Sequence, residues 1–135
     1  MVDMEIAGRW GQRLGRREYF WVCLFIVITL ALHFSVINLP PETMLDEKYY
    51  VGDARSVLQG EDGMRIEHPP LGQLIVLAGV RIFGDTPLGW RFFSVIFGSL
   101  SILLIYLISR QLGFSRLTSN LAASLFAFEN MAFVQ

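Results

Sequence analysis

A predominantly apolar stretch at residues 20–39 constrains this chain more than any other feature of its sequence. A helix of roughly 20 residues, at 1.5 Å per residue, matches the hydrocarbon thickness of a bilayer. Four arginines precede the stretch, and prolines follow it at positions 40 and 41. Proline removes a backbone donor and disfavours helix in the residue before it, so we expect a membrane helix that ends there.

A secretory signal peptide is the alternative interpretation of this stretch, because it also combines a basic start with an apolar run. The run is long for a signal peptide, and no small-residue cleavage site follows it. We therefore expect a helix that is not cleaved. Since the arginines lie before it, the positive-inside rule predicts a cytoplasmic N-terminus and an extracytoplasmic loop after the helix.

Two more apolar stretches of spanning length follow, at residues 90–108 and 117–135. A shorter one, at residues 71–83, would cover only about 20 Å as a helix and contains Arg81. We expect this short helix to lie in the membrane interface. The last stretch ends without a stop signal, which suggests the N-terminal part of a longer protein.

The predicted fold is an all-α integral membrane protein with about three transmembrane helices and an extracytoplasmic loop that bears amphipathic or interfacial helices. The hydrophobic share of 53% agrees with this class. The expected segments are a cytoplasmic N-terminus (1–19), a transmembrane helix (20–39), an extracytoplasmic loop (40–89) with helices at about 46–59 and 71–83, a transmembrane helix (90–108), a cytoplasmic turn (109–116) and a third transmembrane helix (117–135).

The acids of the loop are the first candidates for a functional site. A helix that starts near Asp46 would carry Tyr50 and Ala54 on an apolar face. Asp46, Glu47 and Asp53 would then fall on or beside that face. An unpaired charge is costly there, so acids in such positions are candidates for a functional role. A capping role for the first two acids is the alternative, because carboxylates favour the first turn of a helix.

Other polar residues have two interpretations each. His68, which precedes two prolines, suits a rigid turn with a hydrogen-bonding side chain better than a metal site, because the spacing of nearby acids matches no zinc pattern. Arg91 can contact a phosphate or extend to the membrane interface. Glu129 lies in the last apolar run, where an acid needs a partner or a cavity.

Several functions are excluded or left open by composition. The chain shows no basic patch that would indicate nucleic-acid binding. Its single cysteine, Cys23, allows no internal disulfide and no CxxC site. No cofactor follows from the sequence, and a requirement for a divalent metal stays open.

An ordered set of motifs carries a family resemblance. Asp46-Glu47 and Tyr50 come first, followed by His68-Pro-Pro-Leu-Gly72, then Arg91-Phe-Phe-Ser-Val-Ile-Phe-Gly98 and Phe128-Glu-Asn-Met-Ala-Phe-Val-Gln135. The set resembles the N-terminal part of the protein O-mannosyltransferases and their bacterial relatives, the polyprenyl-phosphate-sugar-dependent glycosyltransferases of the GT-C class. The resemblance implies a multi-pass enzyme of the bacterial or archaeal plasma membrane, or of the endoplasmic reticulum.

The resemblance also implies a reaction and residues for it. Such enzymes move a sugar, here mannose, from a polyprenyl or dolichyl phosphate to an acceptor hydroxyl of a protein serine or threonine, or of a glycan, with inversion. Asp46 would match the base, Glu47 its companion, and Arg91 a residue near the lipid phosphate. Adjacent acids on a helix project about 100° apart, so one should face the reacting centre and the other a neighbour. The further substrate-binding candidates are His68, Tyr50, Asp53, Glu129 and Asn130.

Two positions depart from the family pattern: Gln73 stands where lysine is frequent, and Glu129 where aspartate is frequent. A non-enzymatic membrane module, such as a transporter or assembly subunit with an acidic partner-binding loop, is the alternative function. We expect these 135 residues to be inactive without the remaining C-terminal part of the parent chain, because three helices are too few to enclose a lipid-linked sugar.

Overall fold

The computed structural model describes residues 19–61 and 69–132. These ranges contain α-helices and no β-strand, which confirms the all-α prediction for the described part of the chain. The helices are α2 (Phe20–Val36), α3 (Glu47–Leu58), α4 (Pro70–Phe83), α5 (Pro87–Gln111) and α6 (Arg116–Ala132).

One helix among the described residues is long and apolar enough to cross a membrane, and this is α5. Its 25 residues extend over roughly 37 Å. Helix α2 is also apolar but has 17 residues, and it ends at Val36 rather than at position 39. The reason is a turn before the two prolines, in which the Leu39 N–H donates to the Val36 carbonyl oxygen at 2.8 Å.

Local chemistry explains where the other helices begin and end. Pro70 starts α4, at a position where its missing N–H costs nothing. Gly84 ends α4 with a φ of +83°, a left-handed conformation that glycine adopts without strain. Ser115 precedes α6, and its Oγ accepts the Thr118 N–H at 3.2 Å, which is a typical N-cap interaction.

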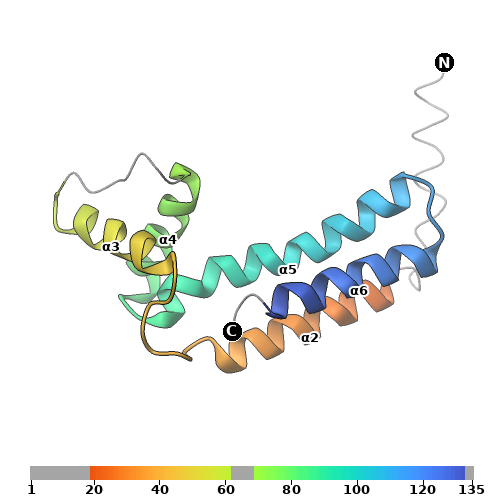
Figure 1. The fold of residues 1–135 in the computed structure, drawn as a ribbon, viewed down its shortest axis with the longest axis horizontal. Helices are drawn as coiled ribbons and strands as arrows, with labels where there is room; N and C mark the ends of the chain where they lie inside the picture. The colour runs from red at the N-terminus through yellow and green to blue at the C-terminus, as the bar shows by residue number, and fades with distance from the viewer. Residues whose placement is uncertain (1–18, 62–68, 133–135) are drawn as a thin grey trace, which may run out of the picture. The chain divides into compact units, whose positions relative to one another are not determined.

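The chain divides into two compact units, of which one comprises Leu30–Gly98. The other unit contains the first part of α2, the second part of α5, and α6, which turns back along α5 in Figure 1. Its core consists of apolar side chains from the three helices and includes small residues that allow close approach. The buried members of this core are Val22, Ile102, Tyr106, Ala123 and Ala127.

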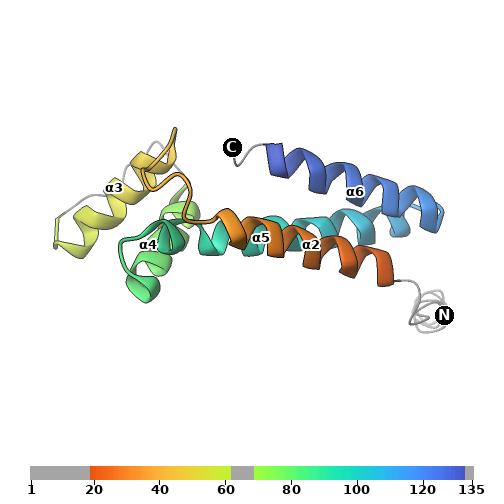
Figure 2. The same ribbon diagram turned by 90° about the horizontal axis from the view of Figure 1, so that it is seen from below.

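Within Leu30–Gly98, α3 and α4 lie side by side, as both Figure 1 and Figure 2 show. The buried core of this unit contains Val51 and Ala54 of α3, Val80 of α4 and Trp90 of α5. The sequence places the first two on the same helical face, because they are three residues apart. The core therefore joins α3, α4 and the start of α5.

An ion pair ties α3 to the turn between α4 and α5. Arg55 donates from Nε and Nη2 to the two carboxylate oxygens of Asp85, at 2.7 and 3.0 Å. The Trp90 Nε1–H donates to Asp85 Oδ1 at 2.7 Å. The hydrogen bonds from Arg55 and then Trp90 hold the pKa of Asp85 below its ordinary value, although desolvation acts in the opposite direction.

Glycine is required where α4 meets the start of α5. A Cβ atom on Gly79 would overlap the carbonyl oxygen of Gly89, and a Cβ on Gly89 would overlap the carbonyl oxygen of Gly84. These neighbours are backbone atoms, which cannot rotate away as a side-chain end can. The close packing of the two helices thus depends on the absence of side chains here.

Gly79→Ala should therefore destabilise the full-length protein, by about 1–3 kcal/mol for overpacking. Gly52→Ala is the matched control, because nothing lies within 4 Å of a Cβ at that position in α3. The Gly52→Ala substitution should stabilise the protein by about 0.4–1 kcal/mol, because alanine reduces the conformational entropy of the unfolded chain. Thermal unfolding in detergent measures both, and equal melting temperatures for the two variants would contradict this packing.

Asp85→Asn should reduce stability by less than about 1 kcal/mol at neutral pH, since the side chains of the ion pair are nearly half exposed. Because the folded state lowers the pKa of Asp85, its ionised form stabilises the fold above the ordinary value of 3.8. The contribution disappears as pH falls through the folded-state pKa. Unfolding measured across acidic pH should thus show the variant and wild type converging, and a difference that grows in acid would contradict the assignment.

Candidate functional site

Arg91, in the first part of α5, uses all of its hydrogen-bond donors on one segment of the chain. Its Nε and Nη2 donate to the two carboxylate oxygens of Glu47, each at 2.8 Å. Its Nη1 donates to the carbonyl oxygens of Ile37 and Pro40, both at 2.9 Å, and Nη2 also donates to that of Glu42 at 3.2 Å. A guanidinium has five N–H donors, so the segment accounts for every one.

This contact is partly buried and bidentate. The exposed fractions of the side chains are 13% for Arg91 and 21% for Glu47. Charge-assisted bonds of this geometry are stronger and more directional than neutral ones. Residues 37–46 lie between α2 and α3, and we infer that Arg91 determines much of their conformation.

Asp46 lies at the N-cap position of α3 with an exposed side chain. Its carbonyl oxygen accepts the N–H groups of Tyr49 and Tyr50, at 3.0 and 3.4 Å. Its side chain makes no capping bond, and among the described residues it has no hydrogen bond or ion pair. The carboxylate is thus available to a ligand.

The residue before Asp46 has an unusual backbone conformation. Leu45 has a φ of +46°, which costs a residue with a side chain roughly 1–2 kcal/mol. Two bonds close this turn: the Met44 N–H donates to Glu47 Oε2 at 3.2 Å, and the Glu47 N–H donates to the Met44 carbonyl oxygen at 2.9 Å. Strained residues of this kind cluster at functional sites, where the surroundings hold them.

The expected position of Asp46 on or beside the apolar face was wrong. Asp46 is the N-cap residue of α3, its backbone is helical, and its side chain is exposed. Asp53, by contrast, is 4% exposed on the buried face, as predicted. The two adjacent acids do have different surroundings: Glu47 meets Arg91, and Asp46 is open.

Tyr50 and Asp53 both lie against α4. The Tyr50 ring lies 3.1 Å from the place where a Cβ of Gly72 would be, so it covers the first turn of α4. Asp53 Oδ2 accepts a hydrogen bond from Gln73 Nε2 at 3.2 Å, and both side chains are buried. Gln73, the position at which the resemblance led us to expect lysine, thus contacts a buried carboxylate through its amide.

The remaining candidates lie outside the described residues or in the other unit. His68 lies outside the described residues. Glu129 belongs to the other unit and is exposed, and Asn130 is described only by its backbone in α6. The described ranges contain no group of three or more side chains that could hold a metal ion.

Sequence reasoning missed Asp85, Arg55 and Trp90 as neighbours of this site. The guanidinium carbons of Arg55 and Arg91 lie 5.6 and 6.0 Å from the Trp90 ring centre, within range of a cation–π interaction. The sequence carries no signal for this neighbourhood, because Arg55 and Asp85 lie 30 residues apart and meet only through the packing of the helices.

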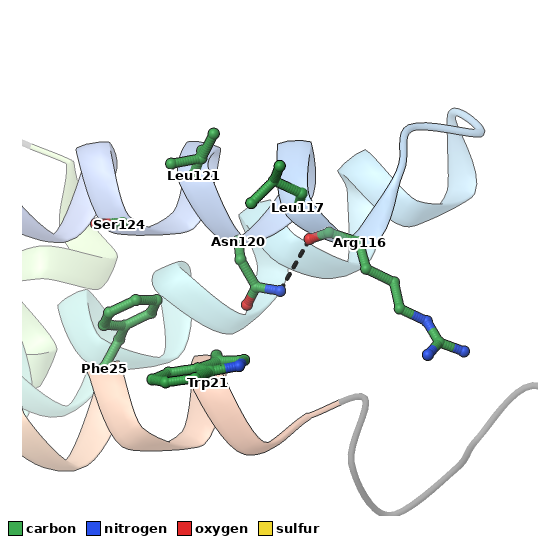
Figure 3. A pocket seen from close by; sticks show the side chains of 7 residues that line it. All are labelled: Trp21, Phe25, Arg116, Leu117, Asn120, Leu121 and Ser124. Atoms are coloured by element: carbon green, nitrogen blue, oxygen red, sulfur yellow. Dashed lines mark hydrogen bonds between the residues drawn. The ribbon is translucent and has the colours of Figure 1, made fainter.

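A groove of about 400 Å³ occurs in the other unit, between α2 and α6. Figure 3 shows Asn120 pointing towards Trp21, while its Nδ2 donates to the Arg116 carbonyl oxygen at 2.8 Å. The lining contains no carboxylate, so the groove offers no base for acid–base chemistry. Its residues are Trp21, Phe25, Arg116, Leu117, Asn120, Leu121 and Ser124.

Comparison with known proteins identifies the family of this chain. Residues 67–135, just over half of the chain, match the family model described as dolichyl-phosphate-mannose-protein mannosyltransferase. Relatives named polyprenol-phosphate-mannose–protein mannosyltransferase are 30% identical over 130 residues in Mycolicibacterium smegmatis and 31% over 121 residues in Corynebacterium glutamicum. A third, from Mycobacterium tuberculosis, is 30% identical over 125 residues.

The alignments cover 87%, 79% and 84% of this chain, and 25%, 23% and 24% of the respective relatives. The chain thus spans about a quarter of the length of these curated relatives. No solved structure matches it. Because the family model covers more than half of the chain, this protein belongs to the dolichyl-phosphate-mannose-protein mannosyltransferase family.

Proposed function

We propose that the chain is the N-terminal part of a membrane enzyme that transfers mannose from a polyprenyl phosphate to a serine or threonine hydroxyl of a protein, with inversion at the anomeric carbon. The observation that carries the proposal is the unpartnered, exposed carboxylate of Asp46 beside the fixed Glu47–Arg91 pair, in a chain of this family. The names of the relatives specify the donor and the type of acceptor.

In the proposed reaction, Asp46 takes the proton of the acceptor hydroxyl. The oxygen attacks the anomeric carbon, and the bond from that carbon to the phosphate oxygen breaks, so the electron pair leaves with the lipid phosphate. Glycosyl transfer passes through an oxocarbenium-like state, in which a positioned base assists the attack. An exposed carboxylate that no neighbouring side chain occupies suits this role.

We assign Arg91 to positioning rather than to the leaving phosphate. Its five donors are already bound to the protein, so a phosphate contact would first require it to release Glu47 or backbone carbonyl groups. By holding Glu47, Arg91 fixes the residue next to the proposed base. A base misplaced by about 1 Å can lose 100-fold in rate, which makes such fixing valuable.

We also propose the membrane arrangement that the sequence predicts, with residues 1–19 in the cytoplasm and the loop at residues 40–89 outside it. The length of α5 supports a span at this position. The arginines before α2 support the direction of insertion. Asp46 would then work at the extracytoplasmic surface, where a lipid-linked sugar and a protein acceptor can meet.

Asp46→Asn should lower mannose transfer by about 100-fold or more, which is the usual contribution of a positioned base. The measurement uses membranes that contain the full-length protein and radiolabelled polyprenyl-phosphate mannose, at matched expression. Glu61→Gln is the control, because Glu61 is an exposed acid just after α3. It should transfer as wild type does.

Equal transfer by Asp46→Asn and wild type would remove Asp46 as the base. Absence of transfer in wild-type membranes with this donor would contradict the proposed reaction. A modest loss that disappears at high salt would instead indicate an acidic surface for a binding partner.

Arg91→Lys should reduce transfer by about 10- to 100-fold, because lysine cannot keep the loop in place. An ammonium has three donors and no planar fork, so at least two of the five acceptors lose their partner. A hydrogen bond to a charged group contributes about 1.5–3 kcal/mol, so the loss of these bonds should also lower the melting temperature. Arg81→Lys, at an exposed arginine of α4, is the control, and identical behaviour of the two variants would contradict the role of Arg91.

A further inference from the structure

Trp90 connects two ion pairs that the sequence gives no reason to associate. Its indole N–H donates to Asp85, which also pairs with Arg55. Its ring lies within cation–π range of both Arg55 and Arg91, and Arg91 pairs with Glu47. The five side chains thus form a continuous series of contacts that ends one residue from Asp46.

The position of the Trp90 ring is closely determined. Trp90 is 7% exposed and packs in the core with Val51, Ala54 and Val80. Such packing restricts the ring, and the 2.7 Å bond to Asp85 Oδ1 selects the orientation in which the N–H is paired. A buried N–H without a partner is costly, so loss of this acceptor should favour another orientation.

The Trp90 ring also approaches the adjacent arginine. The Arg91 guanidinium carbon lies 6.0 Å from the ring centre, and its five donors leave little freedom to adjust. A displaced guanidinium would stretch the two bonds to Glu47 and those to the carbonyl groups of the preceding segment. The result would be a less ordered turn at residues 44–47.

We infer that Asp85 is a positioning residue for the proposed transfer site, and that it acts through Trp90 and Arg91 on the segment that presents Asp46. The inference rests on the proposed function for its effect on the reaction. The structural coupling itself, from Asp85 to the turn at residues 44–47, does not depend on which reaction the site performs.

A simpler role for Asp85 would be to clip α3 to the α4–α5 turn through Arg55. The two roles differ in what Asp85 must provide. An ion pair that holds α3 to the turn needs only opposite charges at positions 55 and 85, whereas positioning needs an acceptor for the Trp90 N–H. Exchange of the charges, with Arg55→Asp and Asp85→Arg together, restores an ion pair but offers Trp90 no acceptor. Asp85→Leu removes both contributions, and Asp85→Asn keeps an oxygen acceptor.

The test measures mannose transfer per folded molecule of the full-length protein for these variants. Asp85→Leu should lower kcat about tenfold with little change in the donor KM, as expected for misplaced groups. Asp85→Asn should lose much less, and the charge exchange should recover thermal stability but not kcat. Wild-type kcat in Asp85→Leu, or recovery of kcat on charge exchange, would overturn the inference. Glu61→Leu, at an exposed acid of the same loop, controls for loss of a carboxylate.

Hydrogen–deuterium exchange of the same purified proteins separates this inference from the proposed function. The amides of residues 42–47 should exchange about tenfold faster in Asp85→Leu than in wild type, because their order depends on Arg91. Exchange there should not change in Glu61→Leu. If wild type transfers no mannose, the proposed function fails, yet the exchange result still decides the coupling: unchanged exchange at residues 42–47 in Asp85→Leu would overturn it.

Discussion

The five hydrogen bonds of the Arg91 guanidinium are the interaction on which the candidate site depends. The segment that they hold is short of donors, because Pro40 and Pro41 have no N–H. It also begins at the end of α2, where helical carbonyl groups lose their partners. A side chain with five donors and no acceptor bonds three carbonyl groups that follow the helix, those of Ile37, Pro40 and Glu42, as well as Glu47. One arginine of α5 thereby gives an irregular segment a defined path into α3.

This arrangement gives two adjacent carboxylates different surroundings. Glu47 is held in a bidentate pair and closes the turn at Met44, so its oxygens are occupied. Asp46 follows a strained residue, is exposed, and has no partner among the described residues. A fixed acid beside an open one is a suitable arrangement for a base, because the first restrains the backbone and the second remains free to meet a substrate.

Apolar length and proline positions act locally, and from them the sequence predicted the all-helical class of the described residues. It also predicted the buried side of Asp53 from helical periodicity. It failed for Asp46, whose side chain is exposed although its backbone is helical, because burial depends on what packs over that end of α3 and periodicity does not contain this. The pairing of Arg91 with Glu47, 44 residues apart, and of Arg55 with Asp85, 30 residues apart, depends on how the helices pack. Periodicity carries no information on such partners.

The most direct test of the account is a double-mutant cycle on the rate of mannose transfer, with Arg91→Met and Glu47→Gln separately and together in the full-length protein. If Arg91 acts by holding Glu47, the second substitution should add little to the first, because residues that act as a unit lose their effect together. The double variant should transfer mannose about as slowly as the slower of the two single variants. Losses that multiply independently would show that the two residues do not work through their ion pair, and would contradict the central role of this contact.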